Sequence, residues 1–335
     1  MPADPASPPA GEFRRIDRYF KPLAASFPGS LGLTNDAAVF AVPPGQELVV
    51  TSDGMVAGIH FFPDDDPADI AAKLMRVNLS DLAAMGADPL AYTLVTALPK
   101  TLPESWLAAF AAALGAEQGR YGIGLAGGDS VSTTGPVTLS LTAMGLVPAG
   151  MALPRRSPRP AGDPVFVTGT IGDAALGLQQ ALGTLAGLAP EDAAVLLERL
   201  RRPEPRLAVG RRLRGLAASC LDVSDGLVAD LGHLAEESGC AAEIDSARVP
   251  LSAAARRAVT ADPSRLVTVL TGGDDYELLF TAPAESRAAV TALAGETGVA
   301  ITEIGRTLDG PAGLVHVLDG QGRPMALPTA GWSHF

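Results

Sequence analysis

The sequence predicts a two-domain protein of mixed α/β and α+β class. Its 335 residues exceed one average domain, and apolar residues make up 47% of them, enough for two cores. Strand-like and helix-like segments are interspersed in both halves. Between the halves, residues 148–164 hold five prolines and two glycines, a composition typical of a domain boundary.

In the first half, apolar runs and alternation predict a set of strands separated by two helices. The alternation is clearest over residues 137–147, where apolar and hydroxyl side chains follow one another with the period of a half-buried strand. The expected strands cover residues 47–52, 91–98, 123–126 and 137–147. One helix is expected after Asp66, which can cap it, with Pro67 in the first turn. The other helix follows Pro103.

The second half begins with VFVTGTIGDAALGL, residues 165–178, which predicts a strand, a glycine-rich turn and a helix. More helices are expected on either side of LDVSDG, residues 221–226. Further strands are expected near residues 241–244, 276–280, 300–304 and 313–317. Each half contains one Ser-Asp-Gly and one later Gly-Gly-Asp, although the segments between them do not match, so an internal repeat receives little weight.

Composition excludes several classes of protein. The formal net charge of −12, without clusters of Lys and Arg, argues against nucleic acid as a partner. No apolar stretch approaches the length of a membrane-spanning helix, and residues 1–12 lack the pattern of a signal peptide and are expected to be a disordered lead-in. Two cysteines at no metal-binding spacing suit a reducing cytosol, so we expect a cytoplasmic protein.

Two glycine motifs resemble nucleotide-binding loops. GIGLAG, residues 122–127, matches the dinucleotide-binding pattern but is expected to follow a helix and open a strand, the reverse of what that pattern needs. Gly172 and Gly177 have P-loop spacing, but Leu178 stands where the motif requires Lys. This turn either brings backbone N–H groups near a phosphate or is an ordinary strand–helix turn. A nucleophile elbow is absent, and the four histidines are scattered.

Aspartates recur where apolar runs end. They are Asp36, Asp53, Asp81, Asp129, Asp222 and Asp225. Each can be explained singly as a helix cap or turn residue, although Asp81 fits poorly because it falls inside an expected helix. Glycines beside three of them would let a ligand approach the backbone.

Taken together, these residues favour a cation site. Oxygen ligands without sulfur or imidazole select Mg²⁺, with Mn²⁺ as a substitute. Mg²⁺ is held by a few carboxylates together with substrate phosphates. The sequence therefore predicts a magnesium–nucleotide site without a P-loop, suited to phosphoryl transfer.

Longer strings resemble one family. TSDGMVAGIHF, DPADIAAKLMRVNLSDLAAMGADP, GGDS, VTGTIGDAALGL, LDVSDGL and GGDDYEL, within a match from Gly11 to Trp332, resemble the thiamine-monophosphate kinase family. That family belongs to the superfamily of aminoimidazole ribonucleotide synthetase and selenophosphate synthetase. The resemblance implies an N-terminal domain, residues 13–148, that binds ATP and Mg²⁺ and whose sheet pairs with that of a second subunit in a barrel-like homodimer. It implies a C-terminal α+β domain, residues 149–335.

The resemblance also assigns roles to residues. The positions matching metal ligands are Asp36, Thr51, Ser52, Asp53, Asp81, Asp129, Asp222 and Asp225. Those matching ATP contacts are Gly128, Asp129, Arg155 and Ser224. Those matching contacts to thiamine monophosphate are His60, Asp274 and Trp332. Without the resemblance, His60 would be interpreted as a core histidine packed between Ile59 and Phe61, and Trp332 as an anchor for the C-terminal tail.

Three positions depart from the family pattern. Asn35 replaces an acid beside Asp36, and this replacement would weaken the binding of a metal ion that depends on that acid. Ser52 replaces threonine and keeps the hydroxyl. Asp274 replaces glutamate and is one methylene shorter.

The implied activity is ATP-dependent phosphorylation of thiamine monophosphate to thiamine diphosphate, the last step in making that cofactor. We expect direct in-line transfer without a protein nucleophile, because the acceptor phosphate is already anionic at neutral pH. One alternative is another enzyme of the superfamily that activates a different oxygen or selenide. The lack of an N-terminal catalytic Cys or Lys disfavours selenide. The other alternative, supported by Asn35, is a non-catalytic protein that binds Mg²⁺ and nucleotide.

Overall fold

The computed structural model describes residues 12–157, 161–328 and 331, and its residues fall into two compact units. The N-terminal unit comprises Met1–Asn78 and Pro89–Leu146. The C-terminal unit comprises Leu79–Asp88 and Val147–Phe335. The expected domain limits, 13–148 and 149–335, stay a prediction. The expected disorder of the lead-in falls on residues 1–11, outside the described part, and on Glu12, which begins a helix.

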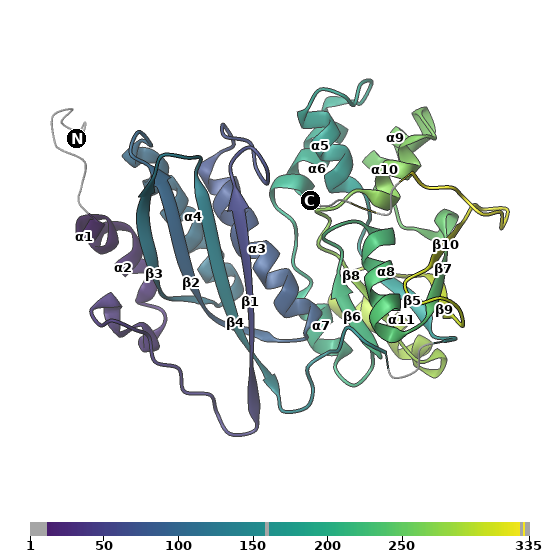
Figure 1. Ribbon diagram of the computed structural model, residues 1–335, viewed down its shortest axis with the longest axis horizontal. Helices are drawn as coiled ribbons and strands as arrows, with labels where there is room; N and C mark the ends of the chain where they lie inside the picture. Colours follow the sequence, from purple (N-terminus) through teal and green to yellow (C-terminus); the bar gives the residue numbers. More distant parts are fainter. Residues whose placement is uncertain (1–11, 158–160, 329–330, 332–335) are drawn as a thin grey trace. The chain divides into compact units, whose positions relative to one another are not determined.

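In the N-terminal unit, short helical segments precede an α/β layer (Figure 1). The elements are α1 (Glu12–Arg15), η1 (Ile16–Phe20), α2 (Lys21–Ala24), η2 (Pro28–Leu33), β1 (Gln46–Val56), α3 (Pro67–Ala84), β2 (Asp88–Pro99), α4 (Glu104–Tyr121), β3 (Gly124–Thr133) and β4 (Thr138–Pro148). The Asp66 carboxylate accepts a hydrogen bond from Ala68 N–H at 2.8 Å, which confirms the expected start of α3. Strand β3 directly follows α4, which confirms that GIGLAG opens a strand.

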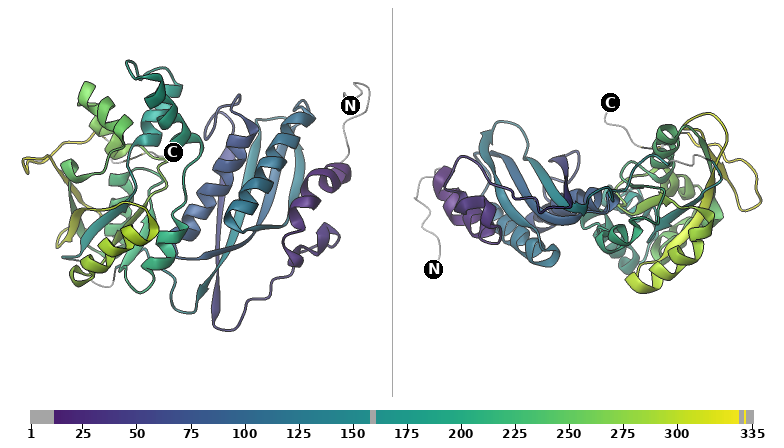
Figure 2. Two further views of the ribbon diagram at one scale, coloured as in Figure 1. Left: turned by 180° about the vertical axis from the view of Figure 1, so that it is seen from behind. Right: turned by 90° about the horizontal axis from the view of Figure 1, so that it is seen from below.

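Over residues 12–148, the described strands form one four-stranded sheet in the order β1-β4-β2-β3. Helices α3 and α4 cover one face of it (Figures 1 and 2). Leu139 and Leu141 of β4 are fully buried, and the intervening residues of β4 are half-buried. Successive side chains of a strand alternate between faces, so one face of the sheet lies on the helices. Within residues 12–148, no described helix covers the other face.

The C-terminal unit consists of a sheet with helices on both faces (Figures 1 and 2). Its elements are β5 (Pro164–Thr168), α5 (Asp173–Ala181), α6 (Pro190–Arg201), α7 (Leu207–Leu213), β6 (Ser219–Asp222), α8 (Leu227–Ser238), β7 (Ala241–Asp245), η3 (Ser246–Arg248), α9 (Ala253–Ala261), α10 (Arg265–Thr271), β8 (Leu278–Thr281), η4 (Ala284–Ser286), α11 (Arg287–Thr297), β9 (Ile301–Leu308) and β10 (Val315–Leu318). The described strands make a six-stranded sheet, β10-β7-β9-β5-β8-β6. Of the five strand pairs of this described sheet, β10–β7 is parallel and the other four are antiparallel.

Alternation along β5 separates two layers of core. Val165 and Val167 pack with α8, α5 and α10 in one apolar cluster. Phe166 faces the other way and stacks on Phe280 of β8, with ring centroids 5.3 Å apart. These contacts are those expected for a sheet covered on both sides. In the described residues, no helix is both long enough and apolar enough to cross a membrane.

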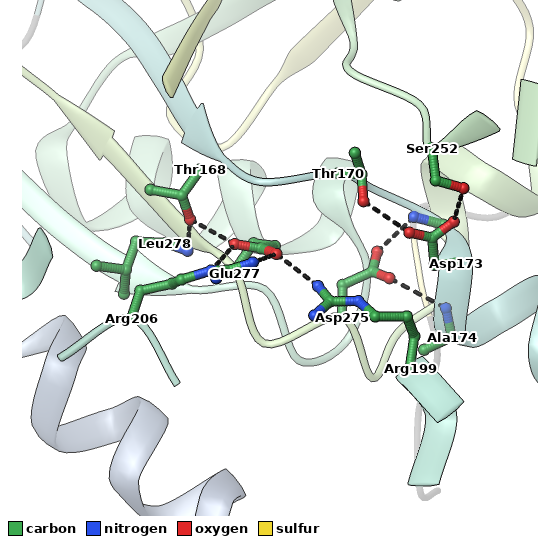
Figure 3. A network of polar contacts seen from close by, with 11 residues as sticks. Thr168, Thr170, Asp173, Ala174, Arg199, Arg206, Ser252, Asp275, Glu277 and Leu278 are labelled. Carbon is green, nitrogen blue, oxygen red and sulfur yellow. Dashed lines mark hydrogen bonds and ion pairs between the residues drawn. The ribbon is translucent and has the colours of Figure 1, made fainter. Parts of the chain in front are cut away.

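A buried carboxylate joins four elements of the C-terminal unit (Figure 3). Glu277 is 0% exposed and accepts hydrogen bonds from Thr168 Oγ1 at 2.7 Å and Arg199 Nη2 at 2.6 Å. Arg206 approaches both carboxylate oxygens at 2.6 and 2.5 Å. Gly169 makes room for this carboxylate, since a Cβ there would lie 2.1 Å from Glu277 Oε1.

Replacing Glu277 with Gln should lower the free energy of unfolding by about 3–5 kcal/mol, because two largely buried arginines lose their shared counter-charge. Chemical denaturation measures this change. The matched control is Glu303→Gln, which removes the partner of the half-exposed Arg287 and should cost less than about 1 kcal/mol. Equal losses in the two variants would contradict a structural role for the Glu277 cluster.

Candidate functional site

Asp53 lies inside strand β1 and not at its end. The strand was expected to stop at Ser52, but β1 continues to Val56. The expectation was wrong because β1 stays hydrogen-bonded beyond Ser52. Even after its last residue, Ala57 N–H donates to the carbonyl oxygen of Val137, directly before β4, at 2.9 Å. Asp53 is therefore held on a rigid strand.

The side chains next to each other in this strand leave it on opposite faces. Ser52 Oγ lies 3.0 Å from Thr142 Oγ1 of β4, on the face away from the helices. Thr51 and Asp53 share the face that meets α3, where Asp53 N–H donates to Asn78 Oδ1 at 3.1 Å. Ser52 and Asp53 thus do not converge through their side chains, and only Thr51 shares the face of Asp53.

The Gly-Gly-Asp of the N-terminal unit also lies within a strand. Strand β3 was expected to end at residue 126, but it runs on to Thr133 in parallel pairing with β2. Gly128 makes this pairing possible, since a Cβ at that position would lie 1.9 Å from Leu94 O. Asp129 is exposed, opposite Val95 in the register, and its Oδ1 accepts from Ser130 N–H at 2.8 Å.

A pocket of about 370 Å³ in the N-terminal unit gathers several predicted residues. Asp36, Gly128 and Asp129 line it, together with Asn35, the position at which an acid is replaced. Its apolar lining includes Ile16, Phe20 and Leu33. The pocket therefore combines two carboxylates and a glycine backbone with an apolar wall, a mixture of polar and apolar groups that is typical of small-molecule sites.

Asp81 and Asp222 belong to the C-terminal unit. Asp81 is half-buried within α3, which confirms its expected place in a helix. Its neighbour Ser80 is fully buried and donates to Asp222 Oδ2 at 2.6 Å. Asp222, 7% exposed, ends strand β6. The hydroxyl of Ser80 thereby fixes the orientation of the Asp222 carboxylate.

Another acid, Asp230, accepts hydrogen bonds from the backbone of the loop that carries Ser224 and Asp225. Three consecutive backbone N–H groups, of Ser224, Asp225 and Gly226, donate to Oδ2 of Asp230 at 3.0, 3.0 and 3.1 Å. Asp230 lies in the first turn of α8 and is 4% exposed. Burial raises the pKa of its carboxyl to about 6, against the opposing effect of those N–H bonds. Ser224 and Asp225 are half-buried, so part of each residue is accessible from outside.

Asp274 lies against the same loop. Its N–H donates to Ser224 O at 2.9 Å, and its Oδ1 accepts from Tyr276 Oη at 3.3 Å. Asp274 and Tyr276 have left-handed backbone conformations, with φ of 72° and 52°. The strand expected from residue 276 therefore begins only at Leu278. The structure brings together Asp274 and Ser224, predicted to contact substrate and ATP respectively.

The glycine-rich turn before α5 does not present its N–H groups to a ligand. Gly172 N–H and Ala174 N–H donate to the carboxylate of Asp275 at 2.6 and 3.3 Å (Figure 3). Asp275 is 3% exposed, and burial raises the pKa of its carboxyl well above the usual range. Of the two interpretations of this turn, the ordinary strand–helix turn is the one the geometry favours.

His60 is not a core residue. It is half-buried in a turn between Ile59, which is 66% exposed, and Phe61, which is 8% exposed. Its Nδ1 accepts from Val56 N–H at 3.1 Å, and its backbone O accepts from Lys73 Nζ at 3.2 Å. The alternative of a core histidine is therefore wrong, and the imidazole orientation is set by the backbone of β1.

The structure gives little information about two of the predicted residues, Arg155 and Trp332. Arg155 is exposed in the segment that links the halves of the chain. Trp332 lies outside the described residues, so both its substrate role and its anchoring role stay predictions. Among the residues that the structure describes, no group of three or more His, Cys, Asp or Glu side chains is gathered as a metal site. Mg²⁺ needs only one or two carboxylates beside phosphate and water oxygens, and the oxygen donors here fit it.

Sequence reasoning missed the residues that orient the predicted ligands. They are Asn78, Ser80 and Asp230. An acid in the first turn of a helix is a recognised partner for the N–H groups before that helix, and this signal was present for Asp230. The partners of Asn78 and Ser80 are far away in the sequence, so no local spacing indicates them.

Comparison with known proteins matches both halves of the chain. Residues 34–147 match the model of the AIR synthase related protein N-terminal domain, and residues 160–317 match its C-terminal domain. The thiamine-monophosphate kinase of Escherichia coli (strain K12) is 44% identical over 326 residues, which cover 97% of this chain and 98% of that protein.

Solved structures agree with the sequence comparison. The crystal structure of thiamine-monophosphate kinase from Stenotrophomonas maltophilia K279a has a TM-score of 0.78 and 42% identity, covering 88% of this chain and 91% of that one. The complex of AaThiL with AMPPCP and TMP has a TM-score of 0.76 and 30% identity, covering 90% and 91%. The chain has the two-domain fold of the AIR synthase related proteins and belongs to the thiamine-monophosphate kinase family.

Proposed function

We propose that this chain transfers the γ-phosphoryl group of ATP to thiamine monophosphate, giving thiamine diphosphate and ADP. The observation that carries the proposal is the pocket of the N-terminal unit, in which Asp36, Gly128 and Asp129 meet an apolar wall. Membership of the family supports it, as does the likeness to a structure that holds AMPPCP and TMP.

The acidic residues suit a nucleotide bound together with Mg²⁺. In the N-terminal unit Asp36, Asp53 and Asp129 are the proposed metal ligands, with Thr51 and Ser52 as further candidates. In the C-terminal unit Asp81, Asp222 and Asp225 have this role. Mg²⁺, when bound, reduces the repulsion between two phosphate groups and stabilises charge on the transferred group. Gly128, Arg155 and Ser224 are the proposed further contacts to ATP.

The acceptor needs no protein base. A phosphate monoester has a second pKa near 6, so its oxygen is already a nucleophile at neutral pH. What the protein must supply is placement of the two phosphates in line. His60, Asp274 and Trp332 are the proposed contacts to thiamine monophosphate. His60 suits this role because the Val56 N–H bond fixes its ring.

Formation of ADP tests the function directly. We expect ADP only when ATP, Mg²⁺ and thiamine monophosphate are all present, with thiamine diphosphate formed in equal amount. ADP formed with another acceptor alone would favour a different enzyme of the superfamily. Binding of ATP without ADP formation under any of these conditions would favour a non-catalytic protein.

Asn at Asp129 or at Asp81 should reduce turnover by at least about a hundredfold, because each change removes a charge that offsets phosphate repulsion. Turnover is measured over a range of Mg²⁺ concentrations, with the melting temperature as a check on folding. Asp17→Asn, which changes an exposed acid of the N-terminal unit paired with Lys21, is the control and should retain normal turnover. Near-normal activity of Asp129→Asn at low Mg²⁺ would remove Asp129 from the site.

Direct transfer predicts that the protein is never phosphorylated. Incubation with γ-labelled ATP and Mg²⁺ should leave no label on the chain, whether the quench is acidic or alkaline, because the acceptor attacks ATP itself. A stoichiometric labelled protein that thiamine monophosphate then discharges would show a two-step route instead.

We further propose that the uncovered face of the N-terminal sheet meets the same face of a second copy, in a barrel-like homodimer. Large apolar side chains project from this face of β1, β2 and β3, and their exposed fractions range from 39% to 56%. They are Leu48, Val50, Val95 and Val131. Apolar groups gathered on a sheet face are typical of an interface. In a two-fold symmetric dimer the same surface of each subunit forms that interface.

A double variant, Val50→Lys with Val95→Lys, should convert the dimer to a monomer, because four lysines would meet across the interface without partners. Sedimentation equilibrium measures the mass. Val195→Lys on α6 is the control, since Val195 is 47% exposed in the C-terminal unit and lies outside this face. A wild-type chain that sediments as a monomer at high concentration would contradict the dimer.

A further inference from the structure

The loop Ser224–Gly226 is held by hydrogen bonds to a residue outside the loop. Its three successive N–H groups converge on one oxygen of Asp230, at 3.0, 3.0 and 3.1 Å. Consecutive N–H groups that point to one centre form a site for an anion. Here the anion is a side chain of the protein itself, so these N–H groups are already used and do not bind a phosphate.

The same loop is fixed from its other side. Ser224 O accepts from Asp274 N–H at 2.9 Å, and Gly273 allows this approach, since a Cβ there would lie 2.2 Å from Ser224 O. Gly226, at φ of 123°, lies close to the end of α10, where a Cβ would be 2.7 Å from Thr271 O. The three N–H groups of the loop and the carbonyl oxygen of Ser224 are therefore used within the protein, while Ser224 and Asp225 themselves are half-buried.

We infer that Asp230 is a positioning residue for nucleotide binding: by taking the three N–H groups it holds the loop so that Ser224 and Asp225 face Mg²⁺ and ATP. This inference rests on the proposed function, which places those two side chains at the nucleotide. Asp230 itself contacts neither metal nor substrate. Asp230 acts through the loop backbone. Residues that hydrogen-bond to metal ligands act in a similar way, because they orient the ligands without contacting the metal.

The test compares Asp230→Asn with Asp173→Asn. In Asp230→Asn the amide oxygen can occupy the place of Oδ2, but it carries no charge, so the three N–H bonds lose their charge-assisted strength. Asp173 is a matched control, because it is 1% exposed, lies in the first turn of α5 and accepts from Thr170 Oγ1 and Ser252 Oγ. It holds none of the proposed ligands.

Two measurements separate positioning from stability. Calorimetric titration with the ATP analogue AMPPCP at fixed Mg²⁺ should show affinity about tenfold weaker in Asp230→Asn and unchanged in Asp173→Asn. Hydrogen exchange of the amides of residues 224–226 should be faster only in Asp230→Asn. Faster exchange with unchanged affinity for Mg²⁺ and AMPPCP would overturn the inference, and so would unchanged exchange.

A second variant tests the inference if Asp230→Asn does not fold. Asp230→Glu then takes its place, since it keeps the charge and should weaken affinity less than tenfold while retaining part of the amide protection. An Asp230→Glu variant with wild-type affinity and no protection of the loop would overturn the inference. The two failures are distinguishable. The proposed function fails if the wild-type chain forms no ADP in response to thiamine monophosphate, whereas this inference fails on the AMPPCP affinity and the amide exchange of the variants.

Discussion

Buried carboxylates determine where the loops of the C-terminal unit lie. Asp230, Asp275 and Glu277 are at most 4% exposed, and a carboxylate removed from water is costly unless donors surround it. For Glu277 the donors are two arginines and Thr168. For the other two they are backbone N–H groups of glycine-containing turns. Asp275 and Glu277 join segments that are far apart in the sequence, whereas Asp230 joins the first turn of α8 to the loop directly before it.

This division of the acids also explains how so acidic a chain can both fold and bind phosphate. Asp230, Asp275 and Glu277 inside the C-terminal unit are matched by donors within the protein. Asp36 and Asp129 of the N-terminal unit are exposed instead and line one pocket, without a neighbouring arginine among its lining residues. Carboxylates left in this way attract divalent cations, which a polyphosphate ligand brings with it. The net charge of −12 is thus compatible with an anionic substrate.

The sequence predicted the order of strands and helices well and their ends less well. Alternation and capping located β4 and α3, because both patterns are local. Strands β1 and β3 ran past their expected ends, since pairing with neighbouring strands continued through the residues whose polarity suggested a turn. The predicted site residues Asp36, Gly128 and Asp129 do share a pocket. Asn78 and Ser80 were missed because their hydrogen bonds join segments that are distant in the sequence. Asp230 lies close to its donors in the sequence and was missed although a local signal was present.

Glycines beside the acids have a different purpose from the one their sequence context suggests. A glycine next to a carboxylate invites the interpretation that a ligand approaches the backbone there. At Gly128, Gly226 and Gly273 the space that a Cβ would occupy is instead filled by backbone of the protein, at 1.9 to 2.7 Å. Gly54 alone of the glycines beside the predicted acids is open, with its nearest neighbour at 3.7 Å. Gly128, Gly226 and Gly273 therefore bring two backbones into contact, and this contact fixes the strand or loop that carries the neighbouring acid.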